Sequence, residues 1–288
     1  RIDNPGEEKF RAQWHQEFPS QLRSVDGIVF WTPLLPVTAD MGPVQIADPE
    51  GIEVRHVETA REMLEAVEAA LKTALLATGR PGILAFEGSY HGLTLGSLAT
   101  TARPAFREPF RSHLHGGVRF ASFPDALDAL DAPDVELARA LDGVEEILAG
   151  RGPGGVPVGA VILETIQGRG GVRVPLPGFV AGVVERARAA GAVVIFDEIF
   201  TGFGRTGRLF AHAWERVEEG GEPVVPDLLC VGKALGGGLP LSACLGRREV
   251  MDAWPPSRGE ALHTSTFLGH PLASATALAF LDVLEEEG

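Results

Sequence analysis

Three continuous apolar runs, each leading into a loop that contains glycine, constrain the fold of this chain more than any other feature. The runs are VGAVILE (158–164), AVVIFDE (192–198) and LLCV (228–231). A helical pattern, GFVAGVVERARAA, occupies residues 178–190 between the first two. Uninterrupted apolar strands that alternate with helices are typical of a mainly parallel sheet. We therefore predict an α/β fold in which helices sandwich the sheet, with ligands bound where the strands end.

Other segments extend this pattern. Helical spacing of apolar residues predicts helices from His56 to Thr78 and from Leu272 to Glu287. Asp134 is a candidate N-cap for a helix that carries Leu137, Leu141, Val144 and Leu148. Short strands are expected at 83–86 and 241–246, whereas residues 1–50 and the stretch before Pro133 show no sustained period.

The composition fits a globular protein of one large domain, or of one domain plus an appendage. Of the 288 residues, 45% are hydrophobic and 22% are charged. The formal net charge of −14 disfavours nucleic acid and anionic membranes as partners, because both attract basic surfaces. No apolar stretch has the length of a transmembrane helix, and RIDNPGEEKF lacks a signal-peptide core, so we expect a cytoplasmic location. Cys230 and Cys244 are expected to be small buried residues.

Lys233 differs from the other two lysines, Lys9 and Lys72, which lie in a polar N-terminus and in a helical pattern. It follows the run at 228–231 by two residues and precedes the glycines at 236–238, where backbone can approach a ligand closely. A lysine in such a place can contact a phosphate, form a structural ion pair or act as a Schiff-base nucleophile.

Asp197 and Glu198 end the run at 192–198. Burying a carboxylate is costly unless a cation or hydrogen-bond donors meet it. The nearest basic neighbour in the sequence is Arg205. From the residues alone, a strand-end cap or an ion pair competes with a role in a site.

Several common sites do not match. Gly232-Lys233 is followed by Ala234 rather than Ser or Thr, so a Walker loop fails. GRGGV (168–172) is not a full GxGxxG, and the chain contains neither GxSxG nor HExxH. We therefore expect no metal site and disfavour an α/β-hydrolase.

FDEIFTGFGRTG (196–207), followed by Lys233 in GKALGGGLP, resembles the class III aminotransferases, which use pyridoxal 5′-phosphate. Three further segments agree: FEGSYHGLTLGSLATT (86–101), VILETIQGRGGV (161–172) and HTSTFLGHPLASATALAFLDVLEEEG (263–288). All occur in the order of the family, from about Ala66 to Gly288. The resemblance implies the large domain of the PLP-dependent transferase fold type I.

The resemblance also implies roles for individual residues. Lys233 would form a Schiff base with the cofactor and Asp197 would pair with its ring nitrogen, which makes both catalytic. Ile199 and Tyr90 would pack on the two faces of the cofactor ring, and His91 would be a further cofactor-binding residue.

Three more positions follow from the same resemblance. Thr266 would reach the cofactor phosphate of a neighbouring subunit, which implies a homodimer with a shared active site. Glu164 would lie near the substrate. Phe200 stands where many members have glutamine, near the phenolic oxygen of the cofactor.

The likeness breaks near the N-terminus. Where the family has a glycine and a small residue before the helix that matches AVEAALK, this chain has Met63-Leu64-Glu65. A Gly-His-x-His-Pro-like stretch is also missing between Gly51 and Ala66. We expect residues 1–65 to be an N-terminal segment joined from incomplete pieces; a reduced homologue that holds cofactor poorly is the other explanation. Residues 66–288 would form the PLP-binding large domain, without the small C-terminal domain of the family.

The leading functional hypothesis is an aminotransferase that moves an amino group between an amine or amino acid and a 2-oxo acid by a ping-pong mechanism. A racemase, epimerase or aminomutase of the same fold is the first alternative. A cofactor-free homologue that acts by binding is the second.

Overall fold

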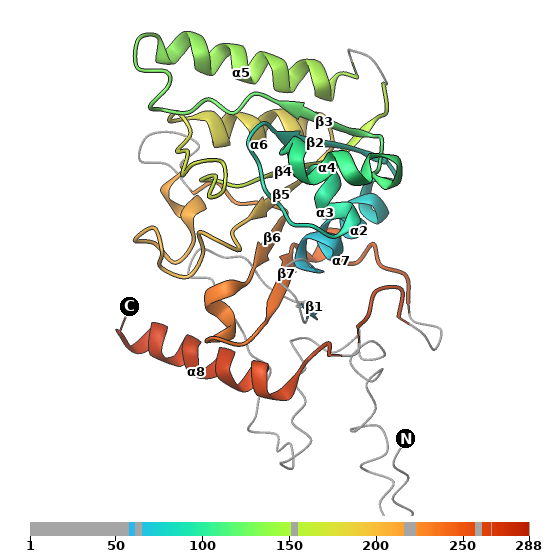
Figure 1. The fold of residues 1–288 in the computed structure, drawn as a ribbon, viewed down its shortest axis with the longest axis vertical. Helices are drawn as coiled ribbons and strands as arrows, with labels where there is room; N and C mark the ends of the chain where they lie inside the picture. The colour runs from blue at the N-terminus through green and yellow to red at the C-terminus, as the bar shows by residue number, and fades with distance from the viewer. Residues whose placement is uncertain are drawn as a thin grey trace, which may run out of the picture.

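The structure, a computed structural model, describes residues 58–60, 65–150, 155–215, 223–256, 261–265 and 267–287. Its centre is a seven-stranded sheet with the order β1-β7-β6-β5-β4-β2-β3 (Figure 1). The strands are β1 (Glu58–Ala60), β2 (Gly82–Phe86), β3 (Val118–Ala121), β4 (Val158–Leu163), β5 (Val193–Asp197), β6 (Leu228–Val231) and β7 (Ser242–Gly246).

The sheet is mainly parallel. Strands β3, β2, β4, β5 and β6 pair in parallel, whereas β7 is antiparallel to both β6 and β1. Val161 is opposite Val194, and Phe196 is opposite Leu229. Because these strands run in one direction, the loops that follow β4, β5 and β6 all leave the sheet on the side where the carboxyl ends of the strands lie. The predicted mainly parallel α/β sheet is confirmed.

Helices cover both faces of the sheet (Figure 1). Helix α2 (Glu65–Thr78) buries Ala66, Val67 and Ala70 together with Ile195 of β5. Helices α5 (Pro133–Leu148) and α6 (Phe179–Ala189) pack in a second cluster that includes Phe196. Consecutive residues of β5 thus enter opposite cores, as the two-residue period of a strand requires.

Shorter helices and the C-terminal helix complete the described part. Helix α8 (Pro271–Glu287) packs beside η4 (Lys233–Gly236), where Thr276 Oγ1 donates a hydrogen bond of 2.9 Å to Gly236 O. The remaining helices are α3 (Leu95–Thr100), α4 (Pro104–Arg107), η2 (Glu108–His113), η3 (Ala211–Trp214) and α7 (Arg248–Met251). Across these residues, no helix combines the length and the apolar character that a membrane span needs.

Several sequence predictions of the elements need correction. Residues 58–60 form a strand rather than the start of the helix, which begins at Glu65. Helix α5 begins at Pro133, with Ala132 as its N-cap, so Asp134 lies within the first turn instead of capping it. Proline suits that first helical position because its missing N–H would have no partner there. The stretch before Pro133 contains β3 and three short helices, and Met63 and Leu64 lie outside the described residues.

Candidate active site

The candidate site lies at the carboxyl ends of the central parallel strands. Glu164 directly follows β4, Asp197 is the last residue of β5, and Lys233 follows β6 by two residues. Asp197 is paired with Cys230 of β6, and Leu163 of β4 is paired with Phe196. Three chemically active side chains predicted from the sequence therefore come from neighbouring strand ends.

Asp197 is held by a buried histidine. His91 Nδ1 lies 2.8 Å from Asp197 Oδ2, and the two side chains are 0% and 6% exposed. A carboxylate only accepts, so Nδ1 carries the proton that His91 donates. The backbone N–H of Ile199 donates a second bond of 3.2 Å to Asp197 Oδ1. His91 Nε2 is buried without a hydrogen-bond partner in the part of the chain that the structure describes.

Lys233 begins the turn η4 with a backbone that non-glycine residues rarely adopt. Its φ is +46°, in the left-handed region, and it follows the extended Gly232. A Cβ at Gly232 would lie 3.3 Å from Ser242 Cβ and 3.5 Å from Ile199 Cγ2, so the chain passes through a narrow space. Residues held in sparsely populated backbone regions concentrate at functional sites.

The ammonium of Lys233 is disfavoured in this position. Burial lowers its pKa below the usual 10.5, Asp197 and Glu164 oppose this effect, and Arg205 and Arg169 add to it. A lysine with a lowered pKa holds more neutral amine, which is the nucleophilic and basic form.

Glu164 connects the two loops that flank the site. Its Oε2 accepts a 2.9 Å bond from the N–H of Tyr90, and its Oε1 accepts a 3.2 Å bond from the N–H of Gly168. Burial raises the pKa of this carboxyl to about 7, with Asp197 adding to the increase while His91 and the two N–H groups reduce it. The carboxyl therefore changes its charge near neutral pH.

The other predicted site residues are distributed as follows. Ile199 is buried beside Gly232. Tyr90 contacts Phe106 edge to face, with ring centroids 5.8 Å apart. Phe200 is 44% exposed, and Lys233 Nζ lies 5.4 Å from its ring centroid. Thr266 lies outside the described residues, so its predicted role stays a prediction.

Glu198, the neighbour of Asp197, serves the fold. It is fully buried, and its Oε1 accepts bonds of 2.8 Å from both the N–H and Nδ1 of His212. Its Oε2 accepts from the N–H of Ala211 at 2.6 Å and from the hydroxyl of Thr201 at 3.2 Å. The two adjacent carboxylates therefore face different surroundings, and Glu198 is hydrogen-bonded to Thr201 and to groups of η3.

Two arginines near Lys233 were not expected in the site. Arg169 Cζ lies 4.5 Å from the ring centroid of Tyr90, and Arg205 Cζ lies 6.0 Å from that of Phe200. The sequence indicates Arg205 only as the basic residue nearest to Asp197. The only sequence signal for Arg169 was a charged residue inside the glycine-rich turn that follows Glu164.

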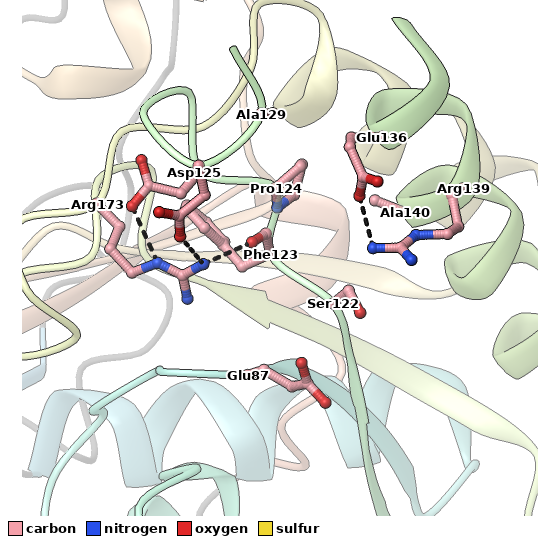
Figure 2. Close-up of a pocket in the computed structure, with 11 residues that line it drawn as sticks. Glu87, Ser122, Phe123, Pro124, Asp125, Ala129, Glu136, Arg139, Ala140 and Arg173 are labelled. Carbon is pink, nitrogen blue, oxygen red and sulfur yellow. Dashed lines mark hydrogen bonds and ion pairs between the residues drawn. The ribbon is translucent and has the colours of Figure 1, made fainter. Parts of the chain in front are cut away.

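A cavity of about 220 Å³ is lined by Arg173, Asp125 and Phe123, among other residues (Figure 2). Arg173 is also the last residue of the turn that carries Arg169. Arg173 closes that turn through two backbone bonds with Gln167. Its side chain donates to Asp125 Oδ2 at 3.1 Å and to Phe123 O at 3.0 Å. The second arginine of the cavity, Arg139, pairs with Glu136. Both arginines are thus paired with protein acceptors, and Arg173 anchors the turn.

The donor set fits a cofactor that has an aldehyde and a basic ring nitrogen. Lys233 provides an amine with a lowered pKa, and Asp197 provides a carboxylate that His91 keeps in place. Such a carboxylate stabilises a protonated ring nitrogen. Among the described residues, no group of three His, Cys, Asp or Glu side chains is arranged to hold a metal ion.

Comparisons with known proteins agree with this geometry. Acetylornithine aminotransferase of Methanosarcina mazei is 38% identical over 223 residues, which cover 77% of this chain and 48% of the relative. An (S)-enantioselective omega-transaminase from Thermomicrobium roseum is 30% identical, with a TM-score of 0.71 over 81% of this chain and 52% of that one. A PLP-bound amine transaminase from an uncultivated Pseudomonas species is also 30% identical, with a TM-score of 0.69 over 81% of this chain and 53% of that one.

The chain spans about half the length of the curated relatives that it matches. The family model described as Aminotransferase class-III matches residues 50–288, which include every strand of the sheet. The expected family and fold type are therefore confirmed: the chain belongs to the class III aminotransferases.

Proposed function

We propose that this chain forms the cofactor-binding part of a PLP-dependent aminotransferase and that residues 66–288 are its large domain. The observation that carries the proposal is the arrangement of Lys233 beside Asp197, whose carboxylate a buried His91 holds at 2.8 Å. Amino transfer between an amine or amino acid and a 2-oxo acid is the reaction that this arrangement supports best.

Asp197 and His91 would set the charge of the cofactor ring. Bound pyridoxal 5′-phosphate supplies an aldehyde for the amine and a ring that withdraws electrons from the substrate carbon. Asp197 would hold the proton on the ring nitrogen, because a carboxylate favours a nearby positive charge. His91 would keep the carboxylate oriented, since its Nδ1–H donates to Oδ2.

Lys233 would carry the covalent attachment and the proton. Its neutral amine would attach to the aldehyde carbon of the cofactor, with the aldehyde oxygen leaving as water. After the substrate amine has displaced it, Nζ would accept the proton from the substrate carbon that bears the amine. Burial supports both roles, because it lowers the pKa of the amine.

The remaining predicted residues complete the proposed site. Ile199 would pack on one face of the ring, and Tyr90 would offer the ring face that Arg169 does not cover. Glu164 would contact the substrate. Thr266 would reach the phosphate of a second subunit in a homodimer. The homodimer and the cytoplasmic location stay predictions.

The test uses the full chain reconstituted with pyridoxal 5′-phosphate. We expect an absorbance band at about 400–430 nm that disappears in Lys233→Ala, together with amino transfer from amino donors to pyruvate or 2-oxoglutarate. Loss of optical activity of an amino acid without amino transfer would favour a racemase or epimerase instead. A wild-type chain without the band would favour a homologue that acts by binding alone.

A further inference from the structure

Cys230 and Cys244, the two cysteines of the chain, lie opposite each other on neighbouring strands. They are paired in the register of β6 and β7, which are antiparallel. Both side chains are fully buried, as the sequence predicts. They share a core cluster with Ala66 of α2, so both point to the same face of the sheet. The Cys244 thiol is hydrogen-bonded to the Cys230 thiol, and the two sulfurs are therefore direct neighbours.

The position of the pair in the ladder suits a covalent bond. Opposite residues of antiparallel strands alternate between pairs that exchange backbone bonds and pairs that do not, and the latter have Cα atoms only about 4.5 Å apart. Cys230 directs its backbone to β5 instead of β7, because its carbonyl accepts a 2.9 Å bond from the N–H of Glu198. Cys230 and Cys244 thus form a pair of the closer kind. A disulfide needs Cα atoms about 4.4–6.8 Å apart, which this position provides.

The two cysteines also enclose the loop that holds the reactive lysine. Residues 231–243, the Lys233 loop, run from one cysteine to the other and include the glycines at 236–238. The φ of Lys233 is +46°, which is unfavourable for a residue with a Cβ. The conformation of this loop therefore depends on what holds its ends. A bond between the cysteines would hold both ends at once.

We propose that Cys230 and Cys244 are a modification site at which a peroxide forms an intramolecular disulfide that fixes the ends of the Lys233 loop. A dithiol would reverse the modification by thiol–disulfide exchange and would itself be oxidised. The inference goes beyond the proposed amino transfer and does not rest on it. Hydrogen peroxide suits the site because it is small and uncharged, whereas both thiols are buried.

Cys244 is placed to react first. The S–H of Cys230 donates to the backbone oxygen of Ala66 at 3.4 Å. The neighbouring Cys244 thiol, burial and the charge of Asp197 raise the pKa of Cys230 well above its usual value. The thiolate is the reactive form of cysteine. Cys230 therefore keeps its proton while Cys244 meets the peroxide.

The reaction has two steps. The sulfur of Cys244 attacks one peroxide oxygen: an S–O bond forms, the O–O bond breaks, and the second oxygen takes up the thiol proton and leaves as water. The sulfur of Cys230 then attacks the sulfenic sulfur: an S–S bond forms, the S–O bond breaks, and the hydroxyl leaves as water with the proton of Cys230. Two thiols and one peroxide give one disulfide and two waters, and two electrons pass from sulfur to oxygen.

The experiment treats the purified full chain with hydrogen peroxide and counts its thiols after denaturation. We expect the count to fall from two to none, a peptide linked through Cys230 and Cys244 to appear in a non-reduced digest, and dithiothreitol to restore both thiols. Peptides are compared rather than whole chains, because peroxide also oxidises methionine. Two retained thiols, sulfinic acid at either cysteine, or a disulfide between two chains would each overturn the proposal.

The variants Cys230→Ser and Cys244→Ser test the order of the steps. Each keeps one thiol and can form no disulfide within the chain. Dimedone, which traps sulfenic acids, should label Cys244 in the first variant. It should label Cys230 in the second at least about 10-fold more slowly, since that thiol keeps its proton. Faster labelling of Cys230 would overturn the assignment of Cys244 as the first group to react.

Thermal unfolding and hydrogen exchange test the effect on the loop. The disulfide should raise the Tm of the wild type by about 6–12 °C, as expected for a closed loop of this length. Amide exchange within residues 231–243 should slow. The two serine variants, treated with peroxide in the same way, report the effect of methionine oxidation alone and should show neither change. An oxidised wild type with an unchanged or lower Tm would show that the bond does not fix the loop and would overturn the proposal.

Discussion

His91 Nδ1 lies 2.8 Å from Asp197 Oδ2, and neither side chain is appreciably exposed to solvent. The pair lies at the end of β5, where Asp197 directly precedes Glu198. Glu198 accepts its own set of hydrogen bonds from η3. Two carboxylates that are adjacent in the sequence thus have separate tasks, and substitutions can distinguish them.

The first prediction concerns Asp197. Asp197→Asn should lower kcat by about 100-fold or more, because it removes a charge that stabilises the reacting state. The affinity for pyridoxal 5′-phosphate should change far less. Steady-state kinetics and cofactor titration measure the two effects. An unchanged kcat would show that the ring nitrogen does not depend on this carboxylate.

The second prediction concerns Glu198. Glu198→Gln should lower the free energy of unfolding by about 3 kcal/mol, because a buried charge-assisted network loses an acceptor and gains a donor that faces other donors. Variants that stay folded should retain most of their kcat. Denaturant titration and kinetics on one preparation test both parts, and a large loss of kcat with full stability would contradict the structural role.

The third prediction is the pH dependence of Lys233. Its amine should titrate below 10.5, because burial disfavours the charged form. Asp197→Asn should shift the midpoint to lower pH, since the carboxylate stabilises the ammonium. Arg205→Gln should shift it to higher pH, since a repelling charge is lost. The rate at which Lys233 of cofactor-free protein is trapped by an aldehyde and a reductant, measured by peptide mass spectrometry, reports each midpoint. A shift in the same direction for both variants would refute the assignment.

The fourth prediction concerns the backbone of Lys233. Its φ of +46° is unfavourable for any residue with a Cβ. Cofactor-free Lys233→Gly should therefore be more stable to denaturant than Lys233→Ala by about 1 kcal/mol. Ala234 provides the control, because its φ is not positive. Ala234→Gly should lose about 0.5–1 kcal/mol. If glycine destabilised both positions equally, the left-handed backbone would not be a source of strain.

The fifth prediction follows from the raised pKa of Glu164, which is about 7 instead of 4.5. Below pH 4.5 the carboxyl is protonated in both the folded and the unfolded protein. As the pH rises from 4.5 to 7, the unfolded protein ionises first, so the folded protein loses stability. Glu164→Gln abolishes this loss. In cofactor-free protein, the free energy of unfolding of Glu164→Gln relative to that of the wild type should rise between pH 4.5 and 7 by up to about 3 kcal/mol. A difference between the two proteins that does not change with pH would contradict the raised pKa of Glu164.

The sequence predicted the centre of the sheet better than its edges. The strands β4, β5 and β6 were recognised because they are buried on both faces and are therefore continuously apolar. The edge strands β1 and β3 have three and four residues and were missed. The pairing of Glu58 with Cys244 is long-range, so no local pattern could indicate it.

The site shows the same division. Lys233 and Asp197 were singled out because charged residues near the ends of apolar runs are unusual, and the resemblance to the family then implied roles for both and for Glu164. Arg169 and Arg205 escaped because their positions depend on the rings of Tyr90 and Phe200, and such contacts between distant loops have no periodicity in the sequence.

The place of β1 beside β7 has a consequence for the order of assembly during synthesis. Among the strands that the structure describes, β1 leaves the ribosome first, yet its partner β7 begins at Ser242. Strands β2, β3, β4 and β5 can pair among themselves much earlier. The chain between β1 and β7 loses conformational entropy before the contacts between these strands form, and pairing of the two strands is therefore slow. The sheet should thus be completed by the strand that was made first, and chaperones would find that segment unpaired for the longest time.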